Sequence, residues 1–296
     1  MPSALIKGNL FPSVLTNELK NLVRGKSSIA RLSQQQPISF NGNTQFTFNL
    51  DSEANFVGER GVKTNGGATV EPVQIVPYKV EYGYRTSDEF LIASDEAKID
   101  TLRAFNEGFA NKLARALDIG AMHGINPRTG KAFAPIGNNH FDAKVTQTVN
   151  RTASINDDIE SAIGIVQGKE HEVTGMAMSP AVKLALSQMK KTDGTPYFPD
   201  LQWGNMPEQI NGLPVDSNST VAFGTGVTDQ VIVGNFRDMF KWGVARDVVL
   251  DIIRYGNPDN SEDGDLAAHN EVFIRAEAYI GWGILVPNAF ARIVNP

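Results

Sequence analysis

The side chains that most often carry out catalysis are few and widely spaced in this sequence. The four histidines are His123, His140, His171 and His269, and the chain contains no cysteine. His171-Glu172 lacks the second histidine, four places after the first, that a zinc protease helix requires. The G-x-S-x-G motif that places a nucleophilic serine on a sharp turn is also missing. We therefore predict that the chain is not an enzyme and that it holds no cofactor and no metal.

A glycine-rich segment, residues 124–137, resembles a phosphate-binding loop only superficially. Five residues separate Gly124 from Gly130, where the phosphate loop has four. Lys131 is followed by Ala132, so the hydroxyl that would hold magnesium is missing. Nucleotide binding is not expected here, and the segment is predicted to be a loop.

The acidic segment 257–270 fits a calcium-binding loop only in part. Asp259, Asp263 and Gly264 match the first, fifth and sixth places of an EF-hand loop, but the twelfth is Asn270 instead of glutamate. No helix is evident on either side of it. A solvated loop is predicted, with weak calcium binding as the alternative.

The composition excludes several classes of protein. The chain has 296 residues, of which 41% are hydrophobic, so one large or two modest domains can be formed. The net charge of −6 has no cluster of basic residues, which argues against an open nucleic-acid groove but not against a surface that encloses nucleic acid. No apolar run approaches the ~20 residues of a membrane span.

The strongest helix signal covers residues 94–123. Apolar residues recur there mostly three or four places apart, and Gly124 follows as a stop signal. The stripe consists of Ile99, Leu102, Phe105, Phe109, Leu113 and Leu117. The pattern predicts one long helix that serves as a spine for the rest of the fold.

Residues 38–86 have the alternating pattern of strands. Phe46, Phe48 and Leu50 alternate with polar residues, and further alternation runs from Val73 to Tyr84. Residues 54–69 between them contain four glycines. We predict two long antiparallel strands with an open end. An isolated hairpin is only marginally stable, so this one needs another surface.

Residues 1–37 are predicted to form an arm. Its apolar stripe includes Leu15, Leu19 and Leu22, followed by a second short apolar piece at residues 27–32. Helices of one or two turns are not stable alone in water. The stripe must therefore be covered by this chain's body or by another chain.

The rest of the chain combines an α+β unit with a long strand. Residues 150–255 alternate helix and strand signals, with further strand candidates at residues 231–233 and 248–253. Residues 272–286 alternate almost throughout, which predicts a strand comparable in length with the long helix. We expect the two to lie side by side. The core residues expected to pack there are Phe105, Phe109, Leu113, Ile274, Ile280 and Trp282.

The order of these parts, together with several short motifs, resembles the major capsid proteins of tailed bacteriophages. These proteins have the Hong Kong 97-type fold, which encapsulin shells share. The segments that carry the resemblance are SSIARL (27–32), ANFVGERGVKT (54–64), YRTSDEFLIAS (84–94), GMAMSPAVKLALSQMKKTDGTPYF (175–198), NGLPV (211–215), VIVGNFRDMF (231–240) and the ending from residue 272.

The resemblance implies an α+β capsid fold with four parts. They are an N-terminal arm (1–37), an extended loop (38–86), a peripheral domain (87–150 and 256–296) that contains the spine helix 94–123, and an axial domain (151–255). The contacts expected between subunits are Leu15, Leu19 and Leu22 in the arm, and Phe56, Glu59, Arg60 and Lys63 at the hairpin end. Some relatives join a loop lysine to a neighbour's asparagine. Because Lys63 and Lys79 lack an alignable acceptor, no such link is expected.

The implied function is architectural. Copies would form hexamers and pentamers that close into an icosahedral shell around double-stranded DNA, assembled in the cytoplasm of the host bacterium and located in the virion. The expected partners are other copies, a separate scaffolding protein, a portal and decoration proteins. The alternatives are an encapsulin-like compartment, which the packaged contents would reveal, and a soluble hydrolase with an unrecognised triad, which would elute as a small oligomer.

Overall fold

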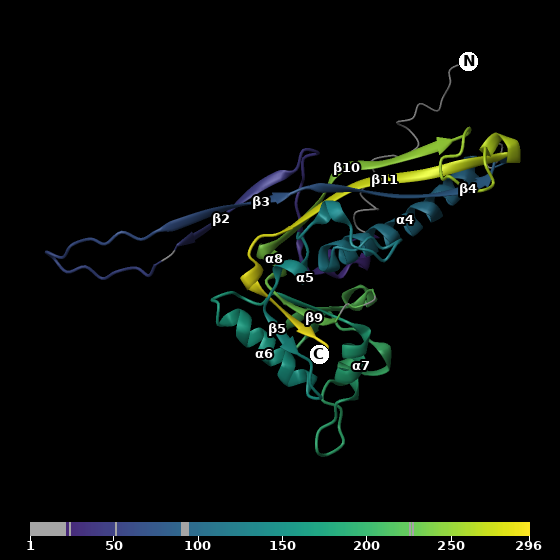
Figure 1. Cartoon of the computed structure of the whole chain (residues 1–296). Helices are drawn as coiled ribbons and strands as arrows, with labels where there is room; N and C mark the ends of the chain where they lie inside the picture. Colours follow the sequence, from purple (N-terminus) through teal and green to yellow (C-terminus); the bar gives the residue numbers. More distant parts are fainter. Residues whose placement is uncertain (1–21, 24, 51, 90–94, 225, 227) are drawn as a thin grey trace.

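Two sheets and a separate hairpin make up the fold (Figure 1). The computed structural model describes residues 22–23, 25–50, 52–89, 95–224, 226 and 228–296. The first sheet has the strand order β1 (Gln34–Gln35), β10 (Phe240–Ile253), β11 (Glu271–Ile284) and β4 (Pro77–Ser87). The hairpin pairs β2 (Asn43–Leu50) with β3 (Ala68–Ile75). The α+β class is as the sequence predicts.

The second sheet has six strands and its own hydrophobic core. Its strand order is β5 (Thr148–Asn150), β12 (Phe290–Val294), β9 (Asp229–Gly234), β6 (Gly175–Met178), β8 (Leu213–Ser217) and β7 (Gln209–Ile210). The helices α6 (Ile155–Gln167) and α7 (Pro180–Gln188) pack against it through Ile159, Val166 and Val182. Ser179 caps α7 by accepting a hydrogen bond from the Val182 N–H, and Pro180 begins the helix.

Short helices and 3-10 turns connect the strands. They are α2 (Ser28–Leu32), α5 (Phe141–Lys144), α8 (Phe236–Met239), η1 (Ala134–Ile136), η2 (Pro199–Gly204), η3 (Ser219–Ala222), η4 (Leu266–His269) and η5 (Pro287–Ala289).

The long helix α4 (Asp95–His123) lies along the four-stranded sheet, as the periodicity of its sequence predicts (Figure 1). Gly124 has φ +66, a left-handed conformation that glycine adopts at little cost, and the helix ends there. The strand predicted at residues 272–286 is also confirmed, because β11 covers most of that range.

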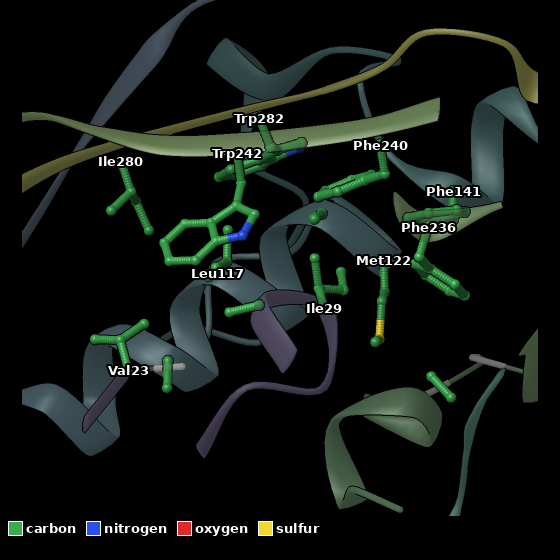
Figure 2. Packing of buried hydrophobic residues seen from close by; sticks show 14 of the residues in the cluster. Val23, Ile29, Leu117, Met122, Phe141, Phe236, Phe240, Trp242, Ile280 and Trp282 are labelled. Atoms are coloured by element: carbon green, nitrogen blue, oxygen red, sulfur yellow. The ribbon is translucent and has the colours of Figure 1, made fainter. Parts of the chain in front are cut away.

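The main core lies between α4 and the four-stranded sheet (Figure 2). Trp242 of β10 and Trp282 of β11 are paired across the sheet, and both are buried. Gly120 lets the Trp282 ring lie against the helix, because a Cβ at position 120 would stand 2.8 Å from that ring. Phe141 stacks on Phe240 and continues the core toward the six-stranded sheet.

Several strands belong to a different sheet from the one that the sequence predicts. The alternation from Tyr78 to Tyr84 is not part of the hairpin: β4 pairs with β11 in the four-stranded sheet. The predicted strand at residues 248–253 is the end of β10, and its Ile252 pairs with Ile274 of β11. Conversely, β12 near the C-terminus pairs with β9 in the six-stranded sheet. Strand alternation records burial on one face and does not identify the partner strand.

Candidate self-assembly surface

The hairpin projects from the body of the subunit (Figure 1). Every residue from 52 to 72 is exposed, including the first part of β3. The body holds the hairpin at its base. Ile75 is buried there and lies against Gly283 of β11. The Gln45 side chain donates a hydrogen bond of 2.6 Å to the Gln36 side chain. The hairpin is therefore anchored at one end only.

One face of the hairpin is apolar across both strands. Phe46, Phe48 and Leu50 share this face because they are two residues apart, and they are 70%, 68% and 68% exposed. Their partners in the register are Pro72, Val70 and Ala68. Residues that are directly paired lie on the same side of a sheet, so six apolar side chains form one continuous surface. An apolar surface of this kind marks an interaction site.

The open end of the hairpin carries the four residues predicted to contact a neighbour. Phe56 is 103% exposed, and Glu59, Arg60 and Lys63 are exposed as well. They lie in the irregular segment between β2 and β3, where a Gly61 N–H donates to the Gly58 carbonyl in a turn. Lys79, the other lysine considered for a covalent link, forms an ion pair of 2.7 Å with Glu277 of its own chain.

The end of the arm belongs to the body of its own chain. Leu15 and Leu19 lie outside the described residues, whereas Leu22 is half-buried and packs against the main core, in which Val23 is buried. In α2, Ile29 is fully buried in the same core. The apolar piece predicted at residues 27–32 is thus covered by the chain itself.

Asp118 of α4 fixes α2 in this position. Its carboxylate accepts hydrogen bonds from the Ser28 N–H (3.0 Å), the Ile29 N–H (3.2 Å) and the Thr220 hydroxyl (3.0 Å). The Ser27 hydroxyl donates a further bond of 2.5 Å. Burial raises the pKa of Asp118 to about 6, although all these hydrogen bonds favour the charged form. One carboxylate therefore satisfies the free donors at the start of α2.

Replacing Asp118 with asparagine is expected to destabilise the subunit by roughly 2–4 kcal/mol, because the new NH₂ group would face donors and leave buried N–H groups unpaired. Chemical denaturation of the unassembled chain measures this loss. The matched control is Asp200→Asn, because Asp200 is exposed and the substitution is chemically the same. The control is expected to cost less than about 1 kcal/mol. Equal stability of Asp118→Asn and the parent chain would contradict the anchoring role.

The six residues predicted to join the long helix to the long strand are placed as follows. Phe109 and Leu113 of α4 are buried in the main core together with Ile280 and Trp282 of β11. Phe105 packs against that core, and its ring centroid lies 5.3 Å from Tyr84 of β4. Ile274 is buried as well. The helix thus contacts β4 in addition to the strand expected from the sequence.

A pocket of about 450 Å³ opens between α4, β4 and the glycine-rich segment 124–137. Tyr78, Phe133, Ile136 and Trp282 are among its lining residues, and neither a histidine nor a serine lines it. Ile125 pairs with Ala132 in the segment, which forms the rim of the pocket. The pocket can accept an apolar group, and the lining carries no nucleophile–base pair.

The side chain of Arg85 binds to the acidic segment 257–270. The Arg85 guanidinium of β4 donates hydrogen bonds to Asp259 (2.7 Å), to the Asn257 side chain (2.8 Å) and to the Gly264 carbonyl (2.9 Å). The hydrogen bonds that the Arg85 side chain donates to Asp259 lower the pKa of that carboxyl group to about 2. The carboxylate of Asp259, the first ligand position of the calcium-loop pattern, is therefore already bound to a cation of the chain itself.

Comparisons with known proteins agree with this architecture. The family described as the phage capsid family matches residues 7–295. A solved structure from Mycobacterium phage Ogopogo is 30% identical, covers 92% of each chain and has a TM-score of 0.79. One from Gordonia phage Cozz is 22% identical, with a TM-score of 0.74 over 100% of this chain and 91% of the other. The capsid of an empty GTA particle, computed with C5 symmetry, is 14% identical, with a TM-score of 0.64 over 100% and 94%. None of the curated proteins compared with the chain matches it.

Proposed function

Because this chain belongs to the phage capsid family, we propose that its hairpin joins each subunit to the next in the capsid shell. The chain is a major capsid protein, and its copies assemble with one another into the shell of a virion. Its family is a structural family and not an enzyme family. No helix in the described part of the chain is long and apolar enough to cross a membrane.

The observation that carries the proposal is the apolar face of the hairpin, defined by Phe46, Phe48, Leu50, Ala68, Val70 and Pro72. Burying these side chains against another surface would contribute about 25 cal/mol for each Å² of apolar area removed from water. The hairpin is anchored only at its base, so its own subunit does not cover the face. A neighbouring copy in the shell is the partner that is always present.

The contact is of the heterologous type, in which one surface of a subunit binds a different surface of the next. Such contacts close into rings when the rotation between copies permits it. The rings proposed here are hexamers and pentamers of an icosahedral shell. At the open end of the hairpin, Glu59, Arg60 and Lys63 are proposed to form ion pairs with the neighbour. Each exposed pair contributes little, but the shell repeats it in every copy.

The shell is proposed to enclose the double-stranded DNA of a tailed phage without reading its sequence. A net charge of −6 gives no general attraction to DNA, so the genome has to be driven in by other components. Assembly is proposed to take place in the bacterial cytoplasm with a separate scaffolding protein and a portal, and decoration proteins would bind the finished shell. The four-stranded sheet and α4 are assigned to the peripheral domain, and the six-stranded sheet to the axial domain.

Gel filtration and electron microscopy of the purified chain test the proposal. The 32.2 kDa chain is expected to form rings or shells of megadalton size, whereas a small oligomer would contradict a shell protein. Deletion of residues 54–69 is expected to leave a folded subunit with unchanged helix content by circular dichroism that does not assemble. Normal shells from the deleted chain would show that the hairpin has no part in assembly.

A further inference from the structure

A cluster of titratable side chains lies where the two sheets meet, away from the hairpin face proposed for assembly. His123 is the last residue of α4, Asp142 belongs to α5, Asp229 begins β9, and Arg292 lies in β12. The His123 Nδ1 lies 2.9 Å from Asp142 Oδ2. One ligand atom from each of His123, Asp142 and Asp229 lies within 4.8 Å of the others.

The surroundings orient these atoms in the way that a metal site requires. The His123 Nε2 lies 2.9 Å from the Thr220 carbonyl, to which it can only donate. A ring that donates through Nε2 keeps Nδ1 available as a ligand, and metal-binding histidines usually have such a carbonyl or carboxylate partner. The Arg292 Nη1 donates to Oδ1 of Asp142 (3.1 Å) and to Oδ1 of Asp229 (2.8 Å). The Oδ2 atom of Asp229 therefore remains for another partner, and Oδ2 of Asp142 faces the His123 Nδ1.

A second observation points to a ligand at this place. Asp229 is only 1% exposed, and its Oδ2 has no hydrogen-bond partner. An unpaired buried carboxylate oxygen is costly, so either a proton or a cation has to be bound there. Asp142, whose side chain is 27% exposed, gives the cluster a connection to solvent.

A divalent ion suits the charged groups that meet here. When both carboxyl groups are ionised, they carry more charge than the single Arg292 guanidinium compensates. An ion bound between them reduces the repulsion between the two carboxylates and supplies the partner that Asp229 Oδ2 lacks.

We propose that His123 Nδ1, Asp142 Oδ2 and Asp229 Oδ2 bind one divalent transition-metal ion, for which Zn²⁺ is the best match. One imidazole and two carboxylates form a donor set that suits zinc, with water in the fourth position. Ligands about 2.1 Å from a zinc ion lie about 3–4 Å from one another, so small side-chain movements complete the site. The ion links α4, α5 and β9, and so it fixes the two sheets to each other. This proposal departs from the expectation from the sequence that the chain holds no metal.

Titration of the EDTA-treated, dialysed chain with Zn²⁺ in weak buffer tests the proposal. We expect one ion per chain, a release of protons and a higher melting temperature, because a ligand that binds only the folded state stabilises it. Asp229→Asn keeps the side-chain volume and is expected to weaken binding at least tenfold, whereas Asp200→Asn, an exposed control, leaves it unchanged.

Two results would overturn the proposal. One is the absence of saturable Zn²⁺ binding to the unaltered chain at concentrations up to about 1 mM, a range that includes weak sites. The other is binding that Asp229→Asn leaves intact, which would place the ion elsewhere. If Asp229→Asn does not fold, titration of the unaltered chain with Co²⁺ still tests the site. Co²⁺ bound there gives the visible spectrum of mixed nitrogen and oxygen ligation. If the site does not bind the ion, no such spectrum develops.

Discussion

A chain in which Phe46, Phe48 and Leu50 are replaced by serine is expected to fold but to form no shells. Burying one large apolar side chain contributes about 1.5–3 kcal/mol, so three of them contribute roughly 5–9 kcal/mol to each contact between subunits. That loss is comparable with the whole binding free energy of a micromolar complex, which is about 8 kcal/mol. Since these side chains are exposed in the single subunit, removing them costs its fold almost nothing.

The measurement is the fraction of chain in particles after sedimentation, together with circular dichroism of the chain that remains free. The matched control carries Thr47→Ser and Glu71→Gln, which lie on the opposite face of the same two strands and are paired with each other. The control is expected to assemble like the parent chain. Shells that form equally well from the triple serine variant would show that the apolar face is not a contact.

Replacing Trp282 with alanine is expected to have the largest effect on the stability of the subunit. The Trp282 ring packs against Gly120 of α4, and its centroid lies 4.8 Å from the centroid of the Tyr78 ring. The indole N–H donates a hydrogen bond of 2.8 Å to the Asn139 carbonyl. Truncating a buried tryptophan typically costs about 3–5 kcal/mol, because a cavity remains where the ring was. The Asn139 carbonyl also loses its donor.

Thermal unfolding measures this loss, with an expected decrease in melting temperature of roughly 6–20 °C. Trp203→Ala is the matched control, because Trp203 is 102% exposed. Its effect on the free energy of unfolding is expected to stay within about 0.5 kcal/mol. A Trp282→Ala chain as stable as the control would mean that the helix and sheet do not depend on this contact.

The sequence predicts the long elements well because their patterns are local. The apolar stripe of α4 and the alternation of β11 each record one buried face, and Gly124 identifies the end of the helix. Which sheet a strand joins depends on residues far along the chain. For this reason the prediction from the sequence placed β4 in the hairpin and β10 in the axial domain, whereas both strands belong to the four-stranded sheet.

The polar contacts that hold the subunit together could not be predicted in this way. Asp118 and α2 are about ninety residues apart in the chain, and Arg85 and Asp259 are separated by even more. The acidic pattern of residues 257–270 suggested a cation, and the cation present is Arg85 from another strand. His123 and Asp142 were visible only as scattered residues, because their proximity follows from the junction of the two sheets.

The alternation of Phe46, Phe48 and Leu50 is informative because it predicts burial that the single subunit does not provide. In the single subunit these side chains are exposed, so the pattern supports the proposal that they are buried between chains. The sequence thus contains information about the assembly, although it does not show which part of the neighbour covers the hairpin.

The most direct test of this account is a reconstruction of the assembled shell by electron cryomicroscopy at a resolution that shows side chains. The account predicts that Phe46, Phe48 and Leu50 are buried against a neighbouring copy in every subunit. A shell in which these residues remain in solvent, or in which the hairpin lies folded on its own subunit, would contradict it.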